Sequence, residues 1–135
     1  MVGDFNAKLG KKQDESEFSL GQHGIGERND QGNTLLQFLL EHNLHAMNTF
    51  FKKAKHRRWT WISSDGNTKN EIDFIIADRK RLVQDVTVLN RVSVGSDHRM
   101  VRATIMVNLR RERKTLTKAS NKKWTAVTNH DISKP

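Results

Sequence analysis

The hydrophobic and polar positions of the chain predict one helix among several short strands. Val2–Asn6 has the pattern of a strand end that leads into a loop, and the polar, glycine-rich stretch Gly10–Gly32 predicts a long surface loop. Asn29 or Asp30 can cap the helix that follows, which we expect to end near residues 41–43. Its broad apolar face has helical spacing and consists of Leu35, Leu36, Phe38, Leu39 and Leu40.

The middle of the chain carries the strongest hairpin signal. A short strand is predicted at Leu44–Asn48, and two segments rich in aromatic and β-branched residues follow at Trp59–Ile62 and Ile72–Ile76. Between them, Ser63–Asn67 contains an Asp-Gly pair that favours a tight reversal. We therefore expect these two segments to pair as a hairpin.

Two longer strands complete the predicted fold. They lie at Val86–Val94 and Met100–Leu109, on either side of a turn at Gly95–His98. The order of strand, helix and several strands predicts an α+β fold with a largely antiparallel sheet. Periodicity fades beyond residue 109, so we expect a domain over residues 1–109 and a basic tail or linker over 110–135, part of which could continue as a basic helix.

Composition limits the classes of protein that fit. The chain has 135 residues, which suits one domain, and it has no cysteine, which excludes disulfides, a thiolate nucleophile and Cys-ligated metal sites. The longest apolar runs, such as Phe74–Ala77, are far shorter than the roughly 18 residues that span a bilayer. Because the N-terminus also lacks the pattern of a secretory signal, we expect an intracellular protein with no membrane partner.

The net charge of +9 is concentrated near the C-terminus. Residues 1–109 hold 16 basic and 13 acidic side chains, whereas residues 110–135 hold 8 basic and 2 acidic ones. A polyanion such as nucleic acid is the natural partner of this basic segment, in which Arg110 and Arg111 are candidate contacts. A solvated linker rich in lysine is an equally compatible interpretation.

Polar residues that suit phosphate chemistry fall in three segments of the predicted strands and turns. Asp4 and Asn6 project from one face of the first strand, Asp73 stands inside an apolar strand, and Asp97 and His98 lie in a turn. Alone, each segment has an ordinary explanation as a turn or as a solvent-facing acid. Together, they allow Asp73 to orient His98 while the oxygens of the other three residues contact Mg2+, as a phosphoryl-transfer site requires.

The same segments resemble a known family. The motifs GDFN at 3–6, WTW at 59–61, IDFI at 72–75 and SDH at 96–98 are similar, in that order, to the endonuclease/exonuclease/phosphatase superfamily. The resemblance is strongest to the apurinic-type endonuclease domain of RTE/BovB non-LTR retrotransposons and the proteins derived from it. It extends over much of residues 3–103.

The resemblance implies a four-layer α/β sandwich and cleavage of DNA phosphodiesters with Mg2+, or with Mn2+ in its place. It implies that Asp4 orients and deprotonates the attacking water and that Asn6 contacts the phosphate. It further implies that Asp73 holds His98, that His98 stabilises charge on a phosphate oxygen, and that Asp97 lies on the metal side. In such endonucleases the loop that here spans Ser63–Asn70 reaches DNA. Candidate DNA contacts near it are Arg58, Lys69 and Asn70, although a solvated basic loop is the alternative.

The resemblance covers only the C-terminal half of that domain. In the family, a Glu that is the principal metal ligand lies in the half that precedes GDFN, so we expect a partial sandwich and weak or no activity. The sequence leaves open whether the chain is such an endonuclease or a non-catalytic nucleic-acid-binding remnant. A phosphatase of the same superfamily fits the basic charge less well. The partners implied are DNA, the N-terminal half of the domain and a downstream reverse transcriptase, and the basic clusters suggest a nuclear location.

Overall fold

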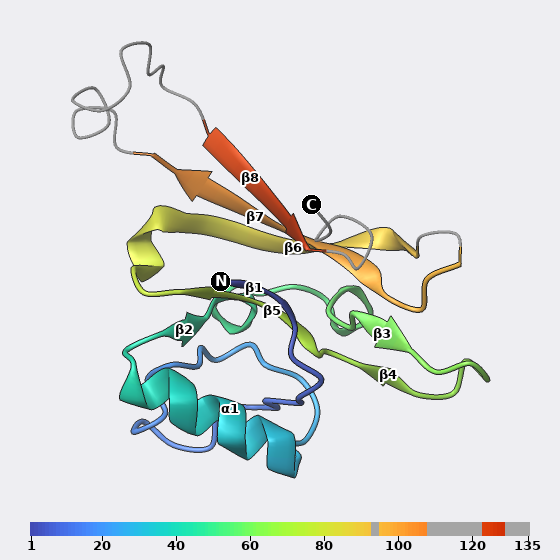
Figure 1. The fold of residues 1–135 in the computed structure, drawn as a ribbon, viewed down its shortest axis with the longest axis horizontal. Coiled ribbons are helices and arrows are strands. Elements are labelled where there is room, and N and C mark those ends of the chain that lie inside the picture. Colours follow the sequence, from blue (N-terminus) through green and yellow to red (C-terminus); the bar gives the residue numbers. More distant parts are fainter. Residues whose placement is uncertain (93–94, 108–122, 129–135) are drawn as a thin grey trace.

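Two three-stranded antiparallel sheets, a two-stranded ribbon and one helix make up the described chain (Figure 1). The computed structural model describes residues 1–92, 95–107 and 123–128. The first sheet consists, in spatial order, of β1 (Val2–Asp4), β5 (Asp73–Ala77) and β2 (His45–Ala46). The second consists of β6 (Val83–Val92), β7 (Arg99–Met106) and β8 (Lys123–Thr128), and the ribbon of β3 (Trp61–Ile62) and β4 (Lys69–Asn70). The helix is α1 (Asp30–Glu41), and the 3-10 helices are η1 (Met47–Phe50), η2 (Lys55–Arg57) and η3 (Lys80–Leu82).

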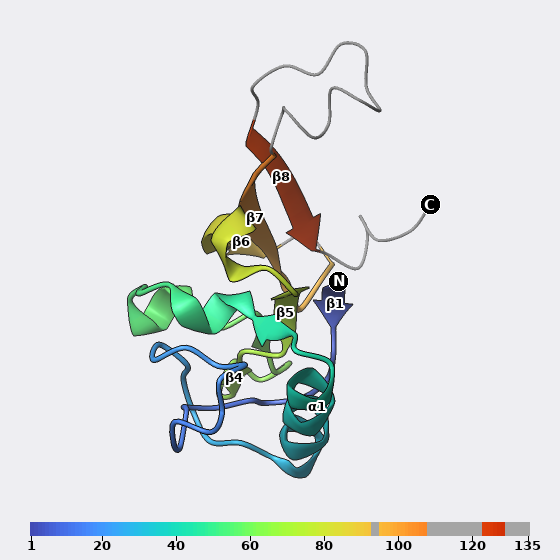
Figure 2. The same cartoon turned by 90° about the vertical axis from the view of Figure 1, so that its left-hand side faces the viewer.

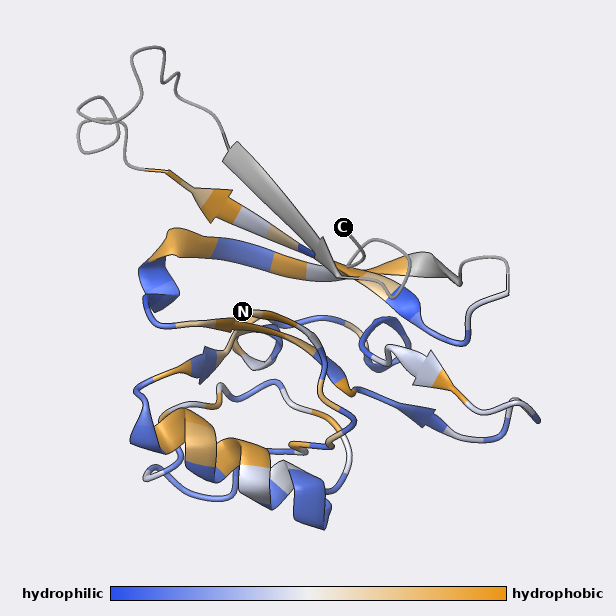
Figure 3. Ribbon diagram, in the orientation of Figure 1, coloured by the Kyte–Doolittle hydropathy of each residue, from blue (hydrophilic) through white to orange (hydrophobic). Residues whose placement is uncertain are grey.

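Strand β5 lies at the centre of the molecule and is covered on both faces. Phe74 packs in a cluster with Leu39 of α1, whereas its neighbour Ile75 packs in a second cluster with Val101 of β7. Figure 2 shows α1 and the second sheet on opposite sides of β5, and Figure 3 shows the hydrophobic colouring along this strand. Because alternate side chains enter two different cores, the sequence of β5 is almost continuously apolar.

Helix α1 begins and ends where the sequence predicts. Asn29 is its N-cap, and the side-chain oxygen of Asn29 accepts a hydrogen bond from the Gly32 N–H at 2.8 Å. The preceding residues, 5–29, contain no helix or strand, as expected for a loop. The loop is nevertheless partly a core element, because Leu20 is fully buried and Arg28 binds both carboxylate oxygens of Glu17 at 2.8 Å.

The predicted hairpin partner is wrong. β3 pairs with β4, within the segment that we expected to be mostly turn, and β5 pairs instead with β1 and β2. The physical reason is burial: a strand with apolar side chains on both faces is satisfied only between two covering layers, not in a two-stranded ribbon. β3 is still joined to the start of β5, because the Thr60 hydroxyl accepts the N–H groups of Ile72 and Asp73.

The second sheet extends beyond the predicted domain. β6 and β7 confirm the two long strands, with a register shift between Val88 and Val92. However, β8 pairs with β7 along its whole length, and it comes from the segment that we expected to be a tail. The predicted boundary at residue 109 therefore cuts through a sheet. The region in which a basic helix was expected lies outside the described residues.

Sheets combined with a helix confirm the α+β class. Neighbouring strands within each sheet are antiparallel, as predicted. In the described ranges, no helix is both long and apolar enough to cross a bilayer.

Candidate active site

The end of β1 and the start of β5 bring two carboxylates face to face. In the antiparallel register Asp4 is the direct partner of Asp73, so both side chains project from the same face of the sheet. The Asp73 side chain is 6% exposed and the Asp4 side chain 25% exposed. Like charges directly opposite each other are destabilising, so this pair needs a proton donor or a cation nearby.

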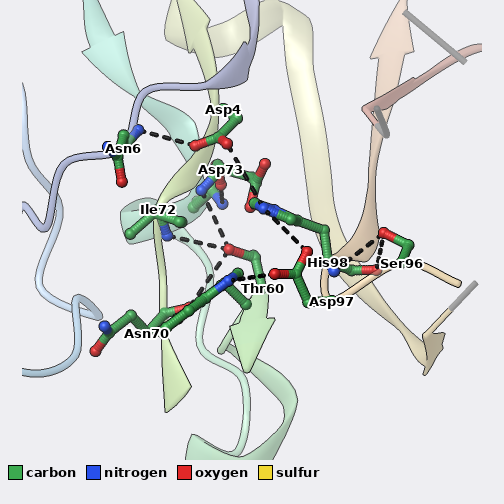
Figure 4. Close-up of polar contacts among 11 residues, drawn as sticks. Asp4, Asn6, Thr60, Asn70, Ile72, Asp73, Ser96, Asp97 and His98 are labelled. Atoms are coloured by element: carbon green, nitrogen blue, oxygen red, sulfur yellow. Dashed lines mark hydrogen bonds and ion pairs between the residues drawn. The ribbon is translucent and has the colours of Figure 1, made fainter. Parts of the chain in front are cut away.

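The imidazole ring of His98 supplies that donor (Figure 4). Its Nδ1 lies 2.8 Å from Asp73 Oδ2, and its Nε2 lies 3.6 Å from Asp4 Oδ2. The backbone holds the ring in place, because His98 forms a β-bridge with Trp61 and the next N–H, of Arg99, donates to the Thr60 carbonyl at 2.7 Å. The structure thus contains the Asp73–His98 pair that the sequence predicts, between segments 25 residues apart.

Asp73 is held in a setting that opposes its ionisation. Burial raises the pKa of Asp73 above its usual value, while hydrogen bonds from Thr60 and His98 pull the pKa down. Asn48 of η1 braces the same strand: its Nδ2 donates to the Asp73 carbonyl at 3.0 Å, and its Oδ1 accepts the Ile75 N–H at 2.9 Å. Separate contacts therefore hold the Asp73 carboxylate and the backbone of the strand that carries it.

Asp97 lies on the Nε2 side of the histidine. Its Oδ1 is 3.8 Å from His98 Nε2, and its Oδ2 accepts a hydrogen bond from the Trp61 indole N–H at 2.9 Å. The Asp97 side chain is 61% exposed, unlike the buried Asp73. Asp4 and Asp97 therefore present two carboxylates on the solvent side of the ring.

Asn6 does not share a strand face with Asp4, which corrects the prediction. β1 ends at Asp4, and Asn6 has a φ of 48°, a left-handed conformation that asparagine tolerates better than most residues. The Asn6 N–H donates to Asp4 Oδ1 at 2.8 Å, so the turn orients the carboxylate through its backbone. Asn6 still lies next to the cluster, as Figure 4 shows.

The donor set fits a hydrated Mg2+. Asp4, Asp73 and His98 each offer a ligand atom, and these atoms lie within 4.8 Å of one another. One oxygen of Asp73 and Nδ1 of His98 are engaged with each other, so the carboxylates of Asp4 and Asp97 are the suitable hard ligands. Mg2+ commonly binds through one or two carboxylates and keeps several waters, which suits a partly exposed pair.

The structure contradicts the prediction that Arg58 contacts DNA. Its side chain is 4% exposed and donates to the carbonyls of Phe51 and Asn48. It also lies 3.8 Å from Glu71, whose pKa burial raises to about 7 against the opposing effect of the arginine. Arg58 therefore braces the loop between η1 and β3, and its terminal guanidinium nitrogens are committed to backbone carbonyls and to Glu71.

The other predicted DNA contacts divide into two groups. Lys69 is exposed on β4, and its ammonium group lies 5.2 Å from the centre of the Trp59 ring. Asn70 is half-buried, and its backbone carbonyl accepts the Thr60 N–H at 2.9 Å. Arg110 and Arg111 lie outside the described residues.

Three residues that shape the site were not singled out from the sequence. The sequence pattern indicates Thr60 and Trp61 only as part of a strand motif, and Asn48 only as the end of a strand. The available signal was weak: a hydroxyl between two tryptophans and an amide within an apolar stretch, HAMNTFF. Their hydrogen bonds run to residues 10 or more positions away, so local patterns do not reveal them.

The chain is similar to known proteins. A family model described as "Endonuclease-reverse transcriptase" matches residues 1–102. The chain is also 32% identical over 112 residues to "Craniofacial development protein 2" of Bos taurus and to the protein of the same name of Tragulus javanicus. Each alignment covers 82% of this chain and 19% of the relative, so the chain spans about a fifth of the length of these relatives. No solved structure matches the chain.

Proposed function

The chain belongs to the endonuclease-reverse transcriptase family, within the endonuclease/exonuclease/phosphatase superfamily, and we propose that its Asp4–Asp73–His98 cluster serves the hydrolysis of DNA phosphodiesters. The observation that carries this proposal is the position of the His98 ring. Nδ1 is bound to a buried carboxylate, and Nε2 faces two partly exposed ones. A histidine oriented in this way presents one defined nitrogen to a substrate oxygen.

Each residue has a separate role in the proposed reaction. Asp4 accepts a proton from water as the water oxygen bonds to phosphorus, and the bond to the leaving sugar oxygen breaks, that oxygen taking a proton from solvent. With both ring nitrogens protonated, His98 donates a hydrogen bond from Nε2 to a phosphate oxygen, where negative charge grows. Asp73 accepts from Nδ1 and maintains the orientation of His98, and the Asn6 side chain contacts the phosphate.

Asp4 and Asp97 are the residues that we propose hold Mg2+, or Mn2+ in its place. When bound, such an ion acts as a Lewis acid that offsets negative charge on the phosphate. Trp61 keeps the carboxylate of Asp97 directed toward the site through its indole N–H. Because only two carboxylates of the described residues suit the ion, we propose that the chain by itself binds it weakly and cleaves DNA slowly.

The finer family assignment is also a proposal. We propose that the two sheets and α1 are part of a four-layer α/β sandwich of the RTE/BovB retrotransposon type, and that residues 1–109 derive from its C-terminal half. The proposed partners are DNA and, in longer relatives, the N-terminal half of the domain and a downstream reverse transcriptase. A nuclear location accords with DNA as the partner.

A non-catalytic nucleic-acid-binding protein is the second candidate function. The observation that favours it is the excess of basic residues over 110–135, which does not depend on the carboxylates. Under this alternative the Asp73–His98 pair persists as a structural contact within the protein.

Nicking of supercoiled plasmid DNA in Mg2+ or Mn2+ separates the two candidates. We expect slow nicking by the chain that His98→Ala and Asp4→Asn abolish, because each removes a group that the reaction uses. His42→Ala is the matched control, since His42 is an exposed histidine at the end of α1, and it should nick as the parent does. If the parent nicks no faster than His98→Ala yet binds DNA, the hydrolytic proposal fails and the binding function remains.

A further inference from the structure

Four residues beside β3 and β4 form a group that the candidate active site does not use. The guanidinium carbon of Arg99 lies 3.5 Å from the centre of the Trp59 ring, and Lys69 lies 5.2 Å from the same ring centre. Arg57 is close enough to act on Arg99 as a like charge. We call Trp59, Lys69, Arg99 and Arg57 the Trp59 cluster; two of its cations lie over one aromatic ring, and the third, Arg57, acts on Arg99 as a like charge.

Arg99 differs from the two other buried arginines that the structure describes. Arg28 is paired with Glu17 and Arg58 with Glu71, so each has a carboxylate in its surroundings. Within the described ranges no carboxylate lies within 4.0 Å of Arg99, whose Nη1 donates to the His56 carbonyl at 3.1 Å. Its Nε is buried and has no acceptor there, as is also true of Arg58 Nε, so the missing carboxylate is what sets Arg99 apart.

An almost fully buried cation without a counter-ion is unfavourable unless something else compensates it. Stacking on an indole offsets only part of this cost, and repulsion from Arg57 adds to the cost. A folded protein keeps such an arrangement at low cost when a bound anion completes it.

The position of the Trp59 cluster indicates which anion fits. Arg99 directly follows His98, and its N–H is bonded to the Thr60 carbonyl, so the cluster and the active site share the same two strand segments. The contacts divide the side chains between two faces. On one face, Thr60 and His98 contact Asp73. On the other, Trp59 stacks with Arg99, and the Trp61 indole N–H donates to Asp97. Asp97, at 3.8 Å from His98 Nε2, lies where these faces meet.

We propose that the Trp59 cluster binds a second phosphate of the nucleic-acid strand, next to the phosphate at His98. Arg99 is the fixed donor, because Trp59 and the His56 carbonyl orient it. Lys69, on β4 of the exposed ribbon, contacts the same phosphate through its ammonium group. This subsite rests on the proposed function for its ligand, DNA. It requires no metal ion and no cleavage, because its cations act through charge and hydrogen bonding alone.

The salt dependence of DNA binding tests the subsite. Binding of the full chain to a fluorescein-labelled DNA duplex is measured by anisotropy in EDTA over a series of NaCl concentrations. We expect Lys69→Gln and Arg99→Gln each to weaken binding and to reduce the slope of log K against log salt by about one, as loss of one phosphate contact does. Trp59→Leu should weaken binding as Arg99→Gln does, although the charges of Lys69 and Arg99 remain, because the indole that orients Arg99 is lost.

The matched control is Lys80→Gln, because Lys80 also lies 5.2 Å from an aromatic ring centre, but over Phe50. It removes the same charge and the same kind of ring contact at a different place, and it should change the slope less than Lys69→Gln does. Equal slopes for Lys69→Gln and Lys80→Gln would overturn the subsite. Thermal unfolding verifies each variant, and if Arg99→Gln does not fold, the exposed Lys69→Gln decides the outcome alone.

The binding and nicking experiments fail independently. A reduced slope in Lys69→Gln without nicking by any protein supports the subsite and contradicts hydrolysis. Nicking that depends on His98, together with a slope that Lys69→Gln does not change, contradicts the subsite and leaves hydrolysis standing.

Discussion

At the scale of single residues, two arginine–glutamate pairs show how geometry decides what a charge does. Arg28 holds Glu17 through two hydrogen bonds of 2.8 Å, and these bonds keep the pKa of Glu17 below its usual value. Arg58 lies 3.8 Å from Glu71, too far for a normal hydrogen bond, and burial there raises the pKa of Glu71 to about 7. In both pairs the arginine favours the ionised acid, but only at Glu17 does its effect on the pKa outweigh that of burial.

Glu71 should make the protein less stable as the pH rises. The pKa of Glu71 is higher in the folded than in the unfolded chain. Its contribution to the free energy of unfolding is therefore fully present below the unfolded pKa of 4.5 and is lost as the pH passes about 7. Between about pH 5 and about pH 8, the parent should lose roughly 2–3 kcal/mol of unfolding free energy relative to Glu71→Gln. Urea unfolding across this range measures the difference.

Glu17→Gln is the control with the opposite sign. Because the pKa of Glu17 is lowered in the folded protein, its ionised form stabilises the fold above the unfolded pKa and loses that effect as the pH falls. The free energy of unfolding of the parent should thus increase relative to that of Glu17→Gln as the pH rises from acidic values. If the free energy of unfolding of the parent also increased relative to that of Glu71→Gln over the same range, the raised pKa of Glu71 would be wrong.

At the scale of elements, the two-residue strand β3 and the residue before it connect three parts of the site. Thr60, just before it, accepts two backbone N–H groups at the start of β5. Trp61, within it, bonds Asp97 and pairs with His98. The segment thereby aligns the beginning of β5 with the beginning of β7.

Thr60→Val should destabilise the protein well beyond an ordinary surface change. Valine keeps the shape of the fully buried threonine but leaves the N–H groups of Ile72 and Asp73 without their acceptor. Two unsatisfied buried donors cost about 2–4 kcal/mol, to be measured by urea unfolding. Thr34→Val, at an exposed position on α1, is the control and should stay within about 0.5 kcal/mol of the parent. Equal unfolding free energies for the two variants would refute the role of the hydroxyl.

At the scale of the whole molecule, β8 closes one edge of the second sheet. It pairs with six residues of β7, from Val101 to Met106, and it also lies against β1 of the first sheet. Without it, β7 would present an open row of backbone donors and acceptors, which favours association with other strands.

Two shortened chains test whether β8 belongs to the fold. A chain that ends at Leu109 loses β8 and should melt at a lower temperature and self-associate, whereas one that ends at Thr128 keeps β8 and should behave as the full chain does. Thermal unfolding and analytical ultracentrifugation measure these outcomes. If both chains melt and sediment alike, β8 contributes nothing to the fold and the boundary at residue 109 is restored.

The sequence by itself determined the elements and residues whose signals are local. The apolar face of α1, its cap at Asn29 and the long strands β6 and β7 follow from spacing and residue type alone. The need of Asp73 for a partner also followed, because a charge in an apolar strand requires one. The motif order further allowed that partner to be named as His98.

Only the tertiary structure decided which segments pair and which charges are accessible. It placed β5 between two cores instead of in the hairpin, buried Arg58 beside Glu71, and set Arg99 against Trp59 with no carboxylate of the described residues within 4.0 Å. The physical reason is that burial and hydrogen-bond partners depend on residues far apart in the chain. Residue type alone assigns Arg58 and Arg99 the same charge, and their surroundings alone make one a structural brace and the other a candidate phosphate ligand.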